Sequence, residues 1–202
     1  MEHLELPSGV RIWLRSDDHF GHQNIIKYTD RPYPHTDAMD SDFIRRHNAL
    51  VDPDDIVIDT GDLALGNIDA SLACAAALNG RKFLIPGNHD RVSKAGRNKP
   101  AYIEKFIPRY EAAGYTVLPE AGVTIDIRGV RFALSHYPYA GDHTERDRHV
   151  EFRPADEGLP LLHGHIHTLR RTEGRMFNVG VDVNDFAPVS QETVLEWAAT
   201  LR

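Results

Sequence analysis

Leu161-Leu162-His163-Gly164-His165-Ile166-His167 combines an apolar pair, a glycine and two histidines one residue apart. Its apolar start predicts a short buried strand, and its glycine predicts that the strand ends there. If the segment stays extended, His165 and His167 point to the same side, because strand side chains repeat every second residue. Two imidazoles on one side of a strand end supply half of a metal site. The rest of the chain must therefore supply the other ligands.

Length and composition predict one globular domain over residues 1–202 in a reducing compartment. Of the 202 residues, 41% are hydrophobic and 26% are charged, as in soluble proteins. No apolar run approaches the roughly 20 residues that span a membrane, and the acidic start, Met1 to Glu5, lacks the features of a signal peptide. The single cysteine, Cys74, excludes an intrachain disulfide. We therefore expect a cytoplasmic protein without a membrane partner.

The formal net charge of −7 limits the partners that the chain can bind. Sequence-independent binding to nucleic acid relies on many Lys and Arg contacts to phosphate, so we expect no stable complex with nucleic acid. One phosphate group at a metal site is not excluded, because there the ions set the local field. The sequence leaves the oligomeric state open.

Hydrophobic patterning predicts strands that alternate with helices, which is typical of an α/β fold. Thr36 and Asp37 are the expected N-cap residues of the second helix, and Ser190 is that of the last. The charged segment 141–153 is expected to be an exposed loop over the site, and its His143 and His149 are read as loop residues, with a catalytic role as the alternative. Strands are expected at 10–15, 56–59, 82–85, 115–118, 123–127, 130–134, 159–162 and 176–183, and helices at 22–28, 36–50, 69–78, 100–113 and 190–201.

Residues that commonly bind metals gather where five of these strands end. Each follows a short apolar segment, and none lies in the middle of a predicted helix. Ligands bind at strand ends in open α/β sheets. His47, by contrast, falls on the apolar face of the helix at 36–50 and is expected to pack there. The strand-end residues are Asp17 with His19, Asp62, Asn88 with His89, His136, and His165 with His167.

The chemistry of these side chains favours a hydrolytic site with two metal ions. The set contains His, Asp and Asn but no thiolate, which disfavours structural zinc and iron–sulfur sites. It also contains more ligands than one ion needs. A carboxylate can bridge two ions, and Asp62, alone in its loop, is the obvious candidate. Two such ions would lie roughly 3.5–4 Å apart and hold the attacking and leaving oxygens of an in-line displacement.

The order Asp-x-His, Gly-Asp, Gly-Asn-His-Asp, Ser-His and Gly-His-x-His resembles the motifs of the calcineurin-like metallophosphoesterase superfamily. These motifs cover nearly the whole chain, from Asp17 to His167. The resemblance implies a four-layer α/β/β/α sandwich of the metallo-dependent phosphatase type, with a dinuclear centre between the loops of its two sheets. It assigns Asp17, His19 and His167 to one metal, Asn88, His136 and His165 to the other, and Asp62 to both.

The resemblance also implies roles for residues that are not metal ligands. His89 would contact the phosphate or protonate the leaving group, and Asp90 would orient His89. The extended motif from Asp17 to Ile26, followed by Arg31-Pro32, is similar to a small bacterial and phage-associated branch without a cap domain. Two residues keep two open roles each: His22 either contacts phosphate or packs at a helix start, and Arg31 either binds phosphate as a charged fork or stabilises a turn.

The expected function is phosphodiester hydrolysis. A water between two cations would lose its proton near neutral pH and attack phosphorus as a bridging hydroxide. Cyclic-nucleotide activity occurs among similar proteins, so small diesters such as 2′,3′-cyclic nucleotides are the expected substrates. The alternatives are a phosphomonoesterase, including a protein phosphatase, and a binding scaffold without activity. Manganese is the expected metal, while iron, zinc and nickel also suit His, Asp and Asn ligands.

Overall fold

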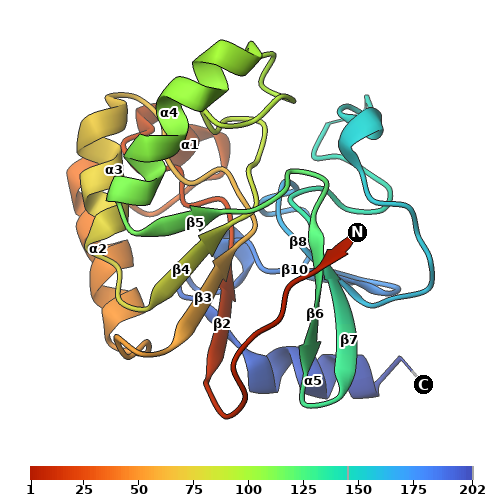
Figure 1. Cartoon of the computed structure of the whole chain (residues 1–202). Coiled ribbons are helices and arrows are strands. Elements are labelled where there is room, and N and C mark those ends of the chain that lie inside the picture. Colours follow the sequence, from red (N-terminus) through yellow and green to blue (C-terminus); the bar gives the residue numbers. More distant parts are fainter. Residues whose placement is uncertain (145, 202) are drawn as a thin grey trace.

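Two β-sheets packed against each other and flanked by helices form the protein (Figure 1). The computed structural model describes residues 1–144 and 146–201. The predicted α/β sandwich is confirmed. The single domain over 1–202 stays a prediction, and its positions 145 and 202 lie outside the described residues.

The helices agree closely with the predicted ranges, whereas several short strands were not predicted. The helices are α1 (Gln23–Tyr28), α2 (Thr36–Asn48), α3 (Ile68–Ala76), α4 (Pro100–Ala112) and α5 (Gln191–Ala199), with 3-10 turns at Val150–Phe152 and Val181–Val183. The strands are β1 (Glu2–His3), β2 (Ile12–Arg15), β3 (Ile56–Asp59), β4 (Arg81–Leu84), β5 (Tyr115–Val117), β6 (Val123–Ile127), β7 (Val130–Leu134), β8 (Leu161–His163), β9 (Thr172–Glu173), β10 (Met176–Asn178) and β11 (Val189–Ser190). Patterning missed β1, β9 and β11 because two residues are too few to show a period.

The first sheet has the order β11-β2-β3-β4-β5 and brings three predicted site loops to one edge. Strands β2, β3 and β4 are parallel, with Ile12 paired to Ile56 and Ile56 to Arg81. Parallel strands end at the same edge of a sheet, so the loops that follow them meet there. These loops carry Asp17 with His19, Asp62, and Asn88 with His89.

The second sheet has the order β1-β6-β7-β8-β10-β9 and supplies the remaining predicted ligands. The predicted hairpin between β6 and β7 is confirmed by the antiparallel pairing of the two strands. Strands β7 and β8 are parallel, so His136 after β7 and His165 after β8 lie at the same edge. The main chain joins this edge to the first sheet, because the Val181 N–H donates to the Ser16 carbonyl at 3.0 Å.

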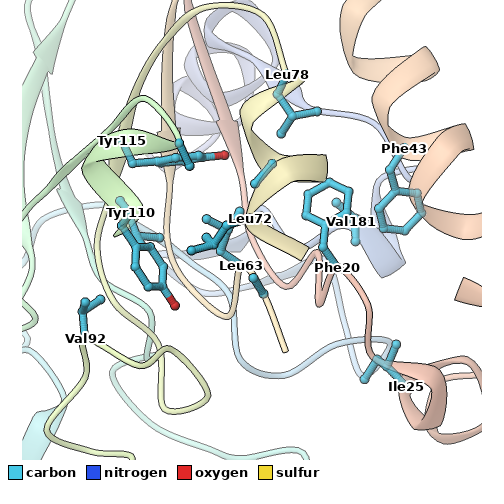
Figure 2. Packing of buried hydrophobic residues seen from close by; sticks show 14 of the residues in the cluster. Phe20, Ile25, Phe43, Leu63, Leu72, Leu78, Val92, Tyr110, Tyr115 and Val181 are labelled. Carbon is cyan, nitrogen blue, oxygen red and sulfur yellow. The ribbon is translucent and has the colours of Figure 1, made fainter. Parts of the chain in front are cut away.

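Packing of Phe20 fixes the loop that carries Asp17 and His19. The Phe20 side chain is fully buried in the cluster between the first sheet and helices α1 to α4, where it lies beside Phe43 (Figure 2). Burial of a phenylalanine side chain stabilises a protein by roughly 1.5–3 kcal/mol. The Phe20 N–H also donates to the Leu63 carbonyl at 3.0 Å. The loops after β2 and β3 are therefore tied to each other beside the predicted site.

Two local predictions about secondary structure are wrong. The segment 176–183 is not one strand: β10 ends at Asn178, whose side-chain oxygen accepts the Gly180 N–H at 2.8 Å and turns the chain. Helix α2 is capped by His35 rather than by Thr36 or Asp37, because His35 Nδ1 accepts the Ala38 N–H at 3.2 Å. In both cases a side chain takes a backbone donor that periodicity does not consider.

The structure also bears on the predictions for His47 and for membrane-spanning helices. His47 packs in the core as predicted, with its Nδ1 2.5 Å from Arg15 Nη1 and its Nε2 2.9 Å from the Asn79 carbonyl. Among the described residues, the helices are all too short or too polar to cross a membrane. The cytoplasmic location stays a prediction.

Candidate metal centre

The predicted ligands meet at one end of the two sheets, and several of them have positive φ angles, a backbone conformation that residues other than glycine rarely adopt. Five of these residues have left-handed backbone, which costs about 1–3 kcal/mol per residue and is common at functional sites. The prediction that His165 and His167 share one side of an extended strand is therefore wrong. Strand β8 ends at His163, and left-handed turns bring both rings to the site. The five residues are Asp17, His19, Asp62, His165 and His167, with φ of +60°, +53°, +57°, +72° and +46°.

Asp17, His19 and His167 form the first of three groups of potential metal ligands among the described residues; the others are Asp17 with Asp62 and His136, and Asp142 with His143 and His165. In the first group, one ligand atom of each residue lies within 4.8 Å of the others, so this group could hold a metal ion. The Asp17 and His19 side chains are almost completely removed from solvent. The structure therefore brings together residues that are separated by about 150 positions in the sequence.

The second group consists of Asp17, Asp62 and His136, so Asp17 belongs to it as well as to the first group. Asp62 Oδ2 lies 3.6 Å from His19 Nε2 and 3.5 Å from His136 Nε2, so one carboxylate oxygen faces both groups. Asn88 Oδ1 lies 3.3 Å from His136 Nε2, and the rings of His136 and His165 are 5.1 Å apart. All seven predicted ligands thus gather around Asp62.

The protonation states of His19, His136 and Asp62 fit metal ions. Burial lowers the pKa of His19 and His136, so both rings are neutral near pH 7, which is the form that binds metals. Burial alone would raise the pKa of Asp62, but the rings of His136, His89 and His19, when charged, and the His89 N–H that donates to Oδ1 lower it below its usual value. Both ring nitrogens of His19 are buried without a hydrogen-bond partner in the described part of the chain. An unpaired buried polar atom costs about 1–3 kcal/mol, a cost that a bound cation would remove.

Two motif glycines allow the loops to approach this closely. A Cβ atom on Gly87 would lie 2.6 Å from the Asp62 nitrogen and 2.7 Å from His136 Cε1. A Cβ atom on Gly164 would overlap the side chains of Ser16 and Asp17. Real Cβ contacts are longer than this, so any larger residue would push the two groups of ligands apart.

Asp182, which patterning did not identify, fixes the ring of His167. His167 Nδ1–H donates to Asp182 Oδ2 at 2.9 Å and leaves Nε2 as its ligand atom. Arg31 donates to the same carboxylate, with its Nε 2.7 Å from Oδ1, and to the Asp17 carbonyl at 2.7 Å. The Arg31 side chain is fully buried. The proposed phosphate-binding role of Arg31 is therefore wrong, because its donors are occupied behind the ligands, and the stabilising role fits.

Asp142 supports His165 in the same manner. Asp142 Oδ2 lies 3.3 Å from His165 Nε2, which leaves Nδ1 as the remaining ligand atom of that ring. The Asp142 side chain is fully buried, and Arg148 lies 3.1 Å from its Oδ1. The expectation that 141–153 is wholly an exposed loop is therefore wrong, since this residue anchors the segment to the site. A charged segment without apolar periodicity gave no signal of this contact.

Asp142→Asn is expected to weaken metal binding by about 10- to 100-fold, because carboxylate partners of metal-binding histidines orient the ring and raise its basicity. Asp147→Asn is the matched control, since Asp147 is exposed on the same segment and pairs with Arg153 at 2.6 Å. Mn²⁺ titration against a fluorescent chelator measures both affinities. Equal affinities of the Asp142 variant and the parent would show that Asp142 only holds the loop.

Asp90 organises the loops instead of contacting the His89 ring. Its carboxylate accepts the N–H groups of Gly87 and Asp62 at 2.8 Å each and that of Leu63 at 3.1 Å. The hydrogen bonds of the described residues include none between this carboxylate and the ring of His89. The expected orienting role of Asp90 is therefore indirect. It fixes the loop that holds His89, while the His89 N–H donates to Asp62 Oδ1 at 2.8 Å.

A cavity of about 400 Å³ opens beside the predicted ligands. His89 lines it, with its ring 5.3 Å from that of His19. His22 also faces the cavity, at a ring distance of 6.3 Å from His89, although its backbone caps α1. The phosphate-contact role of His22 stays a prediction. The remaining wall is partly apolar and includes Ile25, Tyr28, Ile166 and Leu169.

Two residues of the charged segment 141–153 line this cavity. His143 lines it, with Nδ1 3.0 Å from the His165 carbonyl. Arg148 also lines it and lies 2.8 Å from His143 Nε2. His149 instead stacks on Tyr137 at a ring distance of 5.4 Å.

Two phage proteins and one solved structure are similar to this chain over most of its length. The gene 66 protein of Mycobacterium phage D29 is 34% identical over 190 residues, which cover 89% of this chain and 92% of that protein. The gene 66 protein of Mycobacterium phage L5 is 30% identical over 182 residues, with coverages of 84% and 86%. The crystal structure of AQ665 from Aquifex aeolicus, a protein of unknown function, has a TM-score of 0.71 and 25% identity, with coverages of 94% and 100%. No family model matches the chain.

Proposed function

This chain belongs to the protein family of the mycobacteriophage gene 66 proteins, and we propose that it is a metal-dependent phosphoesterase that hydrolyses small phosphodiesters. One observation carries the proposal: Asp62 Oδ2 lies between His19 Nε2 and His136 Nε2, at 3.6 and 3.5 Å. Adjoining ligand groups that share a carboxylate suit two divalent ions. Such ions, when bound, activate water and stabilise the charge of a phosphoryl group.

The residues of the chain divide the work around such a centre. Asp17, His19 and His167 would hold one ion, and Asn88, His136 and His165 the other, with Asp62 shared between them. Asp182 and Asp142 keep two of these rings in position. His89 would act as the general acid that gives a proton to the leaving oxygen, since its ring lines the cavity beside His19.

The charge of the cavity supports a diester rather than a monoester. Arg148 is the only Lys or Arg side chain among the described residues that line it, and Asp142 already pairs with that guanidinium. A diester carries one negative charge and a monoester close to two, so a wall with little free positive charge suits the diester. The partly apolar wall with Tyr28 and Leu169 leaves room for an organic substituent.

A substrate panel with Mn²⁺-loaded protein tests this function. We expect bis-p-nitrophenyl phosphate and 2′,3′-cyclic AMP to be hydrolysed with a higher kcat/KM than p-nitrophenyl phosphate. A clear preference for the monoester would favour the alternative of a phosphomonoesterase or protein phosphatase. Absence of turnover on every ester, with metal bound, would favour a binding scaffold without activity.

A further inference from the structure

A second cavity, of about 650 Å³, adjoins the metal cavity. It lies between the segment that precedes α4 and the segment that follows β7, which occupy the same end of the molecule in Figure 1. Asn88 and Arg148 line both cavities. The two hollows are thus joined at a predicted metal ligand, and one molecule could occupy both.

The second cavity is cationic although the chain is acidic. Lys94, Arg97, Arg146 and Arg148 line it, against Asp147 and Glu151. The whole chain has the opposite balance, with 23 Lys and Arg against 30 Asp and Glu. The charge of Asp147 is further compensated by Arg153 at 2.6 Å.

Arg148 already pairs with Asp142, so the other cationic side chains of this wall are the ones available to an anion. Lys94 and Arg97 form no ion pair within the described part of the chain, and their side chains are exposed together with that of Arg146. Like charges gathered around one hollow repel each other, and a bound anion relieves that repulsion. Guanidinium groups also match the geometry of phosphate oxygens.

We propose that this cavity binds a second phosphate group of the substrate, while the scissile phosphodiester lies in the metal cavity. The inference rests on the proposed function and narrows it to esters with a phosphate on each side of the organic group, such as nucleoside bisphosphate esters or short nucleic-acid ends. A local patch of this kind does not require stable binding to long nucleic acid, which needs contacts to many phosphates.

Calorimetry on the Mn²⁺-loaded protein tests the proposal without turnover. Thymidine 3′,5′-bisphosphate is expected to bind about tenfold more tightly than thymidine 5′-phosphate, because its second phosphate gains charge-assisted hydrogen bonds from the cationic wall. The double variant Arg97→Gln/Arg146→Gln should lose most of this advantage. The matched control Lys105→Gln/Arg128→Gln removes two exposed charges that line neither cavity, and it should keep the advantage.

Competition by inorganic phosphate and a comparison of two substrates, with and without a 3′-phosphate, distinguish failure of this proposal from failure of the proposed function. Inorganic phosphate should compete for the second cavity in the parent and less so in the double variant. Adding a 3′-phosphate to thymidine 5′-(p-nitrophenyl phosphate) should raise kcat/KM for release of p-nitrophenol in the parent but not in that variant. Equal affinity of the parent for both nucleotides, or an advantage that survives the double substitution, would overturn the proposal while bis-p-nitrophenyl phosphate is still hydrolysed. Failure of the proposed function would instead show as no hydrolysis of any ester.

Discussion

Replacing Asp62 by Asn is expected to lower the Mn²⁺-dependent turnover of bis-p-nitrophenyl phosphate by roughly 10³-fold, the scale seen when one group that stabilises transition-state charge is removed. The amide is neutral, so it cannot offer a charged oxygen to the two metal ions that the ligand groups on either side of it would hold. The fold should survive, because the side-chain oxygen of Asn can still accept the His89 N–H that Asp62 Oδ1 accepts at 2.8 Å.

The control for this substitution is Asp54→Asn, since Asp54 is exposed on the turn before β3. That variant should retain parental turnover and parental thermal stability. Initial rates at saturating Mn²⁺, together with a circular dichroism melt of each protein, distinguish lost chemistry from lost folding. Near-parental activity of the Asp62 variant would refute the shared role of this carboxylate.

Replacing His89 by Ala is expected to lower the hydrolysis of 2′,3′-cyclic AMP by about 10²- to 10⁴-fold, which is the usual contribution of a general acid. An alkoxide is a poor leaving group and needs a proton, whereas p-nitrophenolate leaves readily without one. The same variant should therefore lose far less activity on bis-p-nitrophenyl phosphate. Its metal content should match that of the parent, because the His89 contact with Asp62 is made by the backbone N–H.

The measurement for His89 is the ratio of the two kcat/KM values, with metal content determined on the same sample. His35→Ala is a suitable histidine control, because His35 caps α2 away from the cavity. A His89 variant that cleaves the cyclic nucleotide at the parental rate would remove His89 from the reaction. A variant that loses metal would instead make His89 a structural support of the centre.

The sheets and the gathering of the ligands follow from features that a sequence displays. Short apolar runs predicted β3 and β4, and the residues directly after them, Asp62 and Asn88, had to meet because parallel strands end at one edge. Alternation and a two-residue turn predicted the hairpin of β6 and β7. These signals are local, so they can be read without knowledge of the tertiary structure.

Features that depend on tertiary contacts could not be predicted in this manner. The left-handed backbone of His165 and His167 occurs beside tertiary contacts, namely the close approach of Gly164 to Asp17 and the His165 N–H that donates to Asp17 Oδ2 at 3.0 Å. Buried Asp142 contacts His165, and buried Arg31 contacts Asp182, so both depend on partners distant in sequence, although each has the charge of an ordinary surface residue. A charged side chain that supports a ligand looks the same in sequence as one that faces solvent.

The most direct test of the central claim is an anomalous-scattering map from crystals grown with Mn²⁺. Two peaks roughly 3.5–4 Å apart are expected, one between Asp62 and the pair of Asp17 and His19, the other between Asp62 and His136. A single peak, no peak beside Asp62, or metal bound only at the neighbouring group of Asp142, His143 and His165 would contradict that claim.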